Sequence, residues 1–193
     1  MFNILTDTLP DHITVGDDNI LINTSFKTWI KFICIMSNNE MSNAVKLARV
    51  CKLCIGELPK SDTLSDLMEA LVTFSGGIPS EEKAVDVVET SKKAIYDFEL
   101  DSKAIYNSFM AYYHIDLLTA DLHWWQFKTL FDGLGEDTEI MKIVGYRTIN
   151  LSKIKDKEQK SFYQKMKQRY ALPDNRTEEE KEKDMNNMLA MMF

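Results

Sequence analysis

The residues of this chain that could do chemistry by type and spacing are, first, its cysteines. Cys51 and Cys54 form a Cys-x-x-Cys pair, and Cys34 is the remaining thiol. A redox pair of this kind normally follows a strand and opens a helix, where the helix N-terminus lowers the thiol pKa. Here the pair comes late in an apolar helical pattern that runs up to Gly56. We therefore interpret both cysteines as buried structural residues, with a thiol redox pair as the enzymatic alternative.

Metal and phosphate chemistry find little support elsewhere in the sequence. A zinc site needs about four ligands, but there is no second cysteine pair and His12, His114 and His123 are scattered without metal-site spacing. The glycines at 76–77 and 133–135 are too sparse for a phosphate-binding loop. We therefore expect no catalytic residue, no bound cofactor and no metal.

Two adjacent tryptophans lie in the stretch Asp121–Leu134. Trp124, Phe127 and Phe131 recur at the spacing that puts side chains on one face of a helix. We interpret Trp124 and Phe127 as core residues, because large apolar side chains at this spacing are usually buried. Trp125 and Lys128 turn towards another face, which makes them candidates for contact with a partner.

Composition and charge narrow the class of protein. The chain has 193 residues, of which 45% are hydrophobic and 27% are charged, as in an ordinary globular protein. Only 7 glycines and 4 prolines argue against a β-sandwich and favour helices. The formal net charge of -7 disfavours a protein that coats nucleic acid, since such binding neutralises phosphates with Lys and Arg.

Charge is unevenly distributed near the end of the chain. Residues 153–169 hold seven basic residues against two acidic ones, a balance of +5, whereas residues 174–184 have a balance of -3. The basic segment is either a solvated helix face or, as a weaker alternative, a nucleic-acid contact. Beyond it, a short helix or tail would place apolar side chains on one face, and methionine-rich faces adapt to varied partners. These side chains are Met185, Met188, Leu189 and Met192.

The elements that must position these residues are mostly helices. Two β-branched runs on either side of Gly16 predict a hairpin at about 12–23, which must pack on helices or on strands of another subunit. The fold class is thus mainly α: a helical domain over 1–173 with a small N-terminal β-hairpin, and a charged, Met-rich tail or short helix over 174–193. Helices are predicted at 24–37, 40–55, 62–75, 81–97, 101–114, 119–132, 136–145 and 154–171, with N-caps at Thr24, Ser61, Ser80 and Asp101.

No apolar run approaches the roughly 20 residues of a membrane-spanning helix. The N-terminus lacks the basic region of a signal peptide and soon turns acidic at Asp7. We therefore expect no membrane partner and a location in the cytoplasm in which the protein is made.

Five blocks of the sequence together resemble one known protein family. They are the strand-then-helix opening at Ile20–Lys31 and the blocks Tyr106–Leu117, Asp121–Leu134, Val144–Glu158 and Tyr170–Pro173. The family is known as bacteriophage gene product fifteen and comes from the tail region of siphophages and prophages of Gram-positive bacteria. This chain has Ser25 and Lys27 where the family usually has an acidic residue and an arginine. The resemblance implies a place in the tail-morphogenesis module, encoded near the tape-measure protein.

From these observations we expect a non-enzymatic tail morphogenesis protein, a chaperone or adaptor that binds the tape-measure protein. The alternative is a permanent structural component of the tail or its completion complex, found in the virion as well as in the host bacterial cytoplasm. The sequence is also compatible with a homo-oligomer. Besides the methionine-rich end, the candidate contact residues are Trp125, Lys128, Tyr146 and Arg147.

Overall fold

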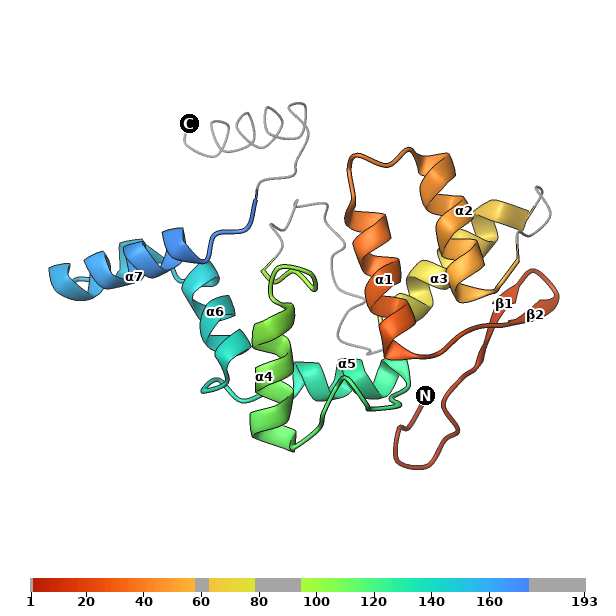
Figure 1. The fold of residues 1–193 in the computed structure, drawn as a ribbon, viewed down its shortest axis with the longest axis horizontal. Helices are drawn as coiled ribbons and strands as arrows, with labels where there is room; N and C mark the ends of the chain where they lie inside the picture. Colours follow the sequence, from red (N-terminus) through yellow and green to blue (C-terminus); the bar gives the residue numbers. More distant parts are fainter. Residues whose placement is uncertain (1, 58–62, 79–94, 174–193) are drawn as a thin grey trace.

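The structure, a computed structural model, describes residues 2–57, 63–78 and 95–173. In these ranges the chain forms a two-stranded hairpin and seven α-helices, which confirms the mainly α prediction (Figure 1). No helix among the described residues is long and apolar enough to cross a membrane. The predicted tail at 174–193, with Met185, Met188, Leu189 and Met192, lies outside these ranges. The elements are β1 His12–Val15, β2 Asp18–Leu21, α1 Phe26–Ser37, α2 Asn43–Cys54, α3 Leu64–Ser75, α4 Ser102–Tyr113, α5 Trp124–Asp132, α6 Glu139–Thr148, a 3-10 turn η3 Leu151–Lys153, and α7 Lys157–Arg169.

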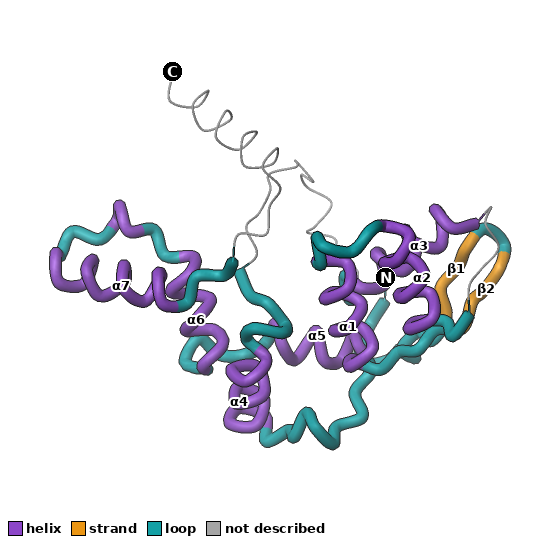
Figure 2. The backbone as a smooth tube through the Cα atoms, turned by 45° about the horizontal axis from the view of Figure 1, so that its top comes forward, coloured by secondary structure: helices purple, strands orange, loops and turns teal. Residues whose placement is uncertain are grey.

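The elements fall into two groups joined by α5. The hairpin and α1 to α3 lie on one side, and α4, α6 and α7 lie on the other. Helix α5 lies between α1 and α4 (Figures 1 and 2). Helix α4 packs on α6, and α6 packs on α7. The molecule is therefore elongated, and α7 forms one of its ends.

The predicted hairpin is confirmed, and it ends at Leu21 instead of at about residue 23. Its register pairs Val15 with Asp18, so Gly16 and Asp17 form a two-residue turn. Gly16 has a φ of +59°, as the first central residue of a type II′ turn requires. Alternation along β1 buries Ile13 and Val15, and the strand packs on α3. The hairpin thus gains from a helix the support that two strands alone lack.

A stack of three phenylalanine rings forms the centre of the core. Phe127 of α5 lies between Phe26 of α1, at 4.9 Å between ring centroids, and Phe109 of α4, at 5.0 Å. The exposed fractions of Phe109 and Phe127 are 0% and that of Phe26 is 3%. Offset and stacked aromatic contacts add to the free energy of apolar burial. The two groups of elements are therefore held together across a single helix, α5.

Helix α5 begins at Trp124, five residues later than the predicted start at 119. The segment before it is extended and pairs with the segment before α1: the Phe26 amide donates to the Leu122 carbonyl at 3.0 Å, and the Trp124 amide donates to the Thr24 carbonyl at 2.7 Å. Ser25 and His123 form an isolated antiparallel bridge. Consequently Ser25, and not Thr24 as predicted, is the N-cap of α1.

Both adjacent tryptophans bury their indole rings against the end of α3. Trp124 is fully buried, as predicted, but Trp125 is only 8% exposed, so it is a core residue and not the exposed surface residue that its position in the sequence predicts. The Trp124 Nε1–H donates to the Ser75 carbonyl and the Trp125 Nε1–H donates to the Phe74 carbonyl, each at 3.0 Å. The last carbonyls of a helix have no partner inside it. The tryptophan pair supplies two of those partners to α3.

The remaining predicted helices differ from the structure mainly at their ends. Helix α6 spans 139–148 instead of 136–145, because Thr138 N and its hydroxyl both bond the Gly135 carbonyl in a turn that delays the helix. Most of the helix predicted at 81–97 lies outside the described residues, and residues 95–97 are not helical. Asp101 is the N-cap of α4, but its side chain does not cap the helix.

The N-cap of α5, His123, makes stability depend on pH. Its Nδ1 accepts from the Trp125 amide at 3.0 Å, and its Nε2 lies 3.0 Å from the Pro10 carbonyl, so the ring is neutral with its proton on Nε2. Burial lowers the pKa of His123 below its ordinary 6.5, against the opposing effects of the Pro10 carbonyl and Asp11. At a pH just below 6.5, His123 therefore binds a proton less readily in the folded protein than in the unfolded chain.

We expect the His123 contribution to stability to be complete above pH 6.5, where the ring is neutral in both states, and to decline as the pH falls below that value. Urea denaturation at a series of pH values from about 7 to about 5 measures this decline. His123→Asn keeps an N-cap side chain without the titrating group, so its stability should depend less on pH than that of the wild type. The same pH dependence in wild type and variant would contradict the assignment. His12→Asn, at an exposed histidine, is the control.

Candidate partner-binding surface on helices α6 and α7

Helix α7 forms locally for clear reasons but is barely buried. Asp156 caps its start, with Oδ1 accepting from the Gln159 amide at 2.7 Å, and Lys167 and Arg169 lie in its last turn, where positive charge favours the helix dipole. No residue of α7 is buried within the described structure. Lys167 Nζ donates to the Ile149 carbonyl at 2.9 Å and ties the helix to the end of α6. Helix α7 therefore exposes most of its surface.

An aromatic strip joins α7 to α6. The Tyr146 ring lies 5.7 Å from Tyr170 in a stacked arrangement, and 6.3 Å from both Phe162 and Tyr163. Phe162 is 49% exposed, and Tyr146, Tyr163 and Tyr170 are partly buried. A single exposed apolar residue is ordinary, but rings gathered on adjacent helices offer a larger apolar area. We call these four residues the aromatic strip.

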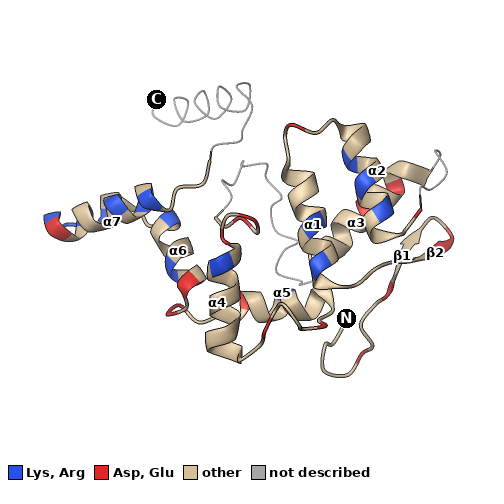
Figure 3. Cartoon of the chain, viewed as in Figure 1, with Lys and Arg blue, Asp and Glu red and all other residues tan. Residues whose placement is uncertain are grey.

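Basic residues are frequent on the helix that carries Phe162 and Tyr163, and the Arg169 guanidinium lies 5.6 Å from the centre of the Tyr170 ring. The five lysines and arginines of α7 follow Lys153 and Lys155, so the positive balance of segment 153–169 lies along this end of the molecule (Figure 3). Long Lys and Arg side chains cover apolar surface with their methylene groups and keep their charges in water. The strip and its lysines are thus suited to a helix that is apolar on one face and acidic at the edges of that face.

Arg147, a predicted contact residue, is instead a buried internal anchor. Its guanidinium forms a two-pronged ion pair with Asp101, with NH1 to Oδ2 at 2.6 Å and NH2 to Oδ1 at 2.8 Å. The same side chain donates to the Tyr170 carbonyl at 2.6 Å and to the Ile95 carbonyl at 3.1 Å. The exposed side-chain fractions are 9% for Arg147 and 6% for Asp101. The expectation that Arg147 is a surface contact is therefore wrong.

The Arg147 anchor sets the position of the aromatic strip. It connects α6 to the segment before α4 and to the residue that follows α7. The Asp101 carboxylate also accepts a hydrogen bond from the Asp97 amide at 2.9 Å. It therefore bonds Arg147 and Asp97 instead of capping α4 as the sequence predicts. Tyr170 is thereby held over Tyr146.

Lys128 and Tyr146 differ in how accessible their side chains are to a partner protein. Lys128 forms an ion pair with Asp132 one turn later, and its side chain is only 19% exposed. Its aliphatic part lies against Gly77, which ends α3 with a φ of +87°. Tyr146 lies in the aromatic strip. Of the four candidate contacts outside the tail, Tyr146 is thus the one placed on the surface that we describe.

Phe162, Tyr163 and Tyr170 were missing from the predicted contact residues. Their signal in the sequence is the spacing Phe162, Tyr163, Met166 and Tyr170, which puts an apolar stripe on an otherwise charged helix. The positive charge of the segment is typical of a solvated basic face. The aromatic residues within it are the more informative part.

The cysteines occupy the core rather than a reactive site. Cys51 and Cys54 have exposed fractions of 0% and 1%, which confirms their predicted burial, and both are free thiols on α2. Burial raises the pKa of Cys51, and burial with the nearby Cys51 raises the pKa of Cys54 to about 12. Burial, Glu99 and Asp97 raise the pKa of Cys34 to about 11. Within the described residues, no group of three His, Cys, Asp or Glu side chains is placed to hold a metal ion.

We expect these thiols to resist modification in the native protein, because the thiolate is the reactive form and burial disfavours it. Ellman's reagent at pH 8 should react with Cys51 and Cys54 only as fast as the protein opens, and with all three cysteines at once in urea. Cys34→Ser separates the partly exposed thiol from the buried pair. Rapid reaction of Cys51 or Cys54 in the folded protein would contradict this prediction.

A family model described as Bacteriophage Gp15 protein matches residues 5–172, which is more than half of the chain. The chain belongs to the Bacteriophage Gp15 family. Membership makes it a phage-related protein of the structural or morphogenesis class, and the resemblance noted in the sequence is confirmed. Comparison with curated proteins and with solved structures found no match. The match covers both groups of elements, from the hairpin to the aromatic strip.

Proposed function

We propose that this Gp15 protein is a tail assembly chaperone or adaptor that binds the tape-measure protein in the host cytoplasm. The observation that carries the proposal is the aromatic strip on α6 and α7, which lies at one end of the molecule among lysines. A tape-measure protein is a long, apolar helix before the tail tube encloses it. The strip suits the helix-in-groove mode, in which an apolar helical face packs between aromatic side chains.

The charges around the strip support binding that is selective and reversible. Lysines at the rim of an interface chiefly speed association and orient the partner, while desolvated aromatic side chains supply most of the affinity. Phe162 would be the main anchor, since about half of its surface remains to be covered. Association should therefore weaken with salt but persist through the apolar contact.

Co-expression with the neighbouring tail genes tests the proposal. The tagged protein should co-purify with the tape-measure protein and keep it soluble, and Phe162→Glu should abolish both effects by placing a charge in the strip. Leu118→Glu is the matched control, because Leu118 is 73% exposed in the loop between α4 and α5, away from the strip. An insoluble tape-measure protein in the presence of wild type would refute the chaperone. If the protein is found in purified mature virions without such binding, it is a permanent component of the tail.

A further inference from the structure

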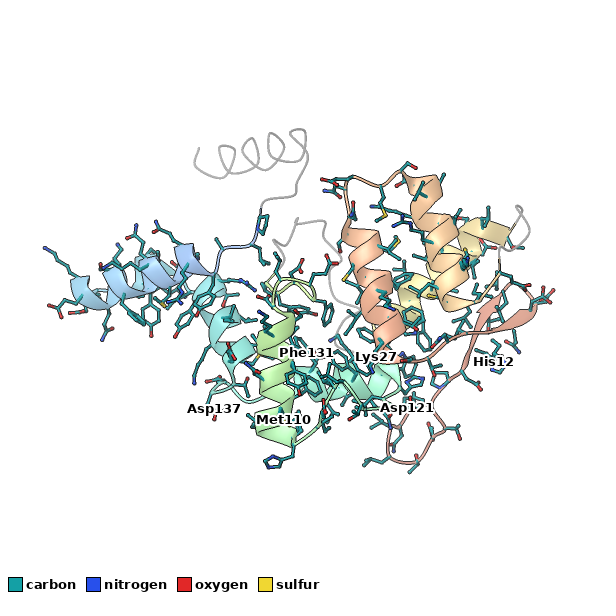
Figure 4. The ribbon with its side chains drawn as sticks, in the orientation of Figure 1. His12, Lys27, Met110, Asp121, Phe131 and Asp137 are labelled. Carbon is teal, nitrogen blue, oxygen red and sulfur yellow. The ribbon has the colours of Figure 1, made fainter. Side chains whose placement is uncertain are left out.

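The groove between β1 and α3 is a second surface, on the other group of elements. It has a volume of about 510 Å³ and is lined along one side by residues 12–16 and along the other by α3. The α3 side presents Asp66, Glu69, Ala70 and Thr73, which recur at helical spacing and so form a single stripe. Trp125 and Phe74 also line it, and His12 lies on the strand side (Figure 4).

The strand side of the groove is an unpaired sheet edge. Ile22 N donates to the Asp11 carbonyl, so by the alternation of an antiparallel ladder Ile13 and Val15 bond to β2. His12 and Thr14 then direct their amides and carbonyls to the opposite edge. Among the described residues no backbone hydrogen bond is formed by these groups. Free donors and acceptors along an edge are a template for another strand.

The helix side of the groove is acidic. Asp66 and Glu69 are exposed, and neither forms an ion pair with another residue in the described part of the chain. A second copy of the protein would bring its own acidic wall, with Asp17 and Asp18 at the hairpin turn, against this one. The like charges disfavour pairing between copies and favour a basic ligand.

We propose that an extended segment of a partner protein, in which apolar residues alternate with lysine or arginine, adds to β1 as a third strand in this groove. Its backbone bonds His12 and Thr14, as in other cases of strand addition to an exposed edge. Along a strand every second side chain faces the same way, so its basic side chains face α3, where they reach Asp66 and Glu69 and cover Ala70 and Trp125 with their methylene groups. The apolar side chains between them lie on the other face of the sheet, beside the exposed side chains of His12 and Thr14. This site is separate from the aromatic strip and gives the protein two different partner surfaces.

The probe is a fluorescein-labelled peptide of alternating Lys and Val, titrated with the full-length protein in fluorescence anisotropy. The matched ligand carries N-methyl groups on the amides that face β1, which removes hydrogen bonds without changing charge or side chains. We expect its affinity to fall at least about tenfold. In spectra of the ¹⁵N-labelled protein, the native peptide should shift the amide signals of His12 and Thr14.

Charge variants test the acidic wall. The double variant D66N/E69Q should bind the peptide about fivefold more weakly, the scale of two exposed ion pairs. E40Q/E136Q removes the same charge at exposed acids outside the groove and should bind as wild type does. Phe162→Glu should bind the peptide normally, which separates this proposal from the role of the aromatic strip.

Equal affinity for the N-methylated peptide, or unshifted His12 and Thr14 amides, overturns the proposal. A wild-type dimer in sedimentation that the peptide dissociates would assign the groove to a second copy and would also overturn it.

Discussion

Replacing Arg147 with alanine is expected to destabilise the protein by about 3–5 kcal/mol, because it leaves the buried Asp101 carboxylate without its partner. The change also removes the donors to the Tyr170 and Ile95 carbonyls. The segment before α4 and the end of α7 would then lose their common anchor. Urea denaturation followed by far-UV circular dichroism measures the loss.

Two variants define what the Arg147 result means. Lys165→Ala removes an exposed basic residue from α7 and should change stability by less than about 0.5 kcal/mol. The double variant D101L/R147M replaces both charges with apolar groups and should recover much of the stability lost in Arg147→Ala, since neither charge is then left unpaired. A loss below about 1 kcal/mol in Arg147→Ala would show that water reaches the pair and that the anchor is weak.

Replacing Trp124 with alanine is also expected to destabilise the protein by about 3–5 kcal/mol, because removal of its fully buried ring leaves a cavity. The ring packs on Phe127, with 5.8 Å between centroids, and on Phe98 at 6.3 Å. The lost volume therefore lies beside the phenylalanine stack that joins the two groups of elements. The free energy of unfolding in urea is again the measurement.

Trp124→Phe separates the ring from its hydrogen bond. Phenylalanine keeps an aromatic ring in place but cannot donate to the Ser75 carbonyl, so a loss of about 1–3 kcal/mol is expected. Trp125→Phe removes the equivalent donor to Phe74 and should cost a similar amount. If both phenylalanine variants were as stable as wild type, capping of α3 by the indoles would be energetically unimportant.

Much of the fold follows from periodicity in the sequence. The spacing of Trp124, Phe127 and Phe131 predicts a helix with a buried face, and the short alternating run around Ile13 predicts a strand that the structure confirms. Such patterns are local, because each depends only on which side of its own element meets the core. They therefore also identify the cysteines of α2 as buried.

The sequence could not predict contacts that depend on distant elements. Trp125 points away from the face of Trp124, but α5 is covered on that side by the end of α3, and the indole N–H finds a carbonyl there. Arg147 and Asp101 are 46 residues apart, so nothing local marks them as a pair. A helix with two covered faces and a buried ion pair both arise from tertiary packing. For this reason the exposed positions predicted for Trp125 and Arg147 were wrong, whereas the elements were largely placed correctly.

The position of α5 has a consequence for synthesis of the chain on the ribosome. Phe26 can stack on Phe127 only after Phe127 has been synthesised, and Lys27 donates to the Leu118 carbonyl, 91 residues later in the sequence. Contacts between distant residues slow folding, because a long loop must close before they form. During translation the N-terminal elements therefore expose their aromatic residues until α5 has left the exit tunnel. The nascent chain is most open to aggregation or premature pairing in that interval.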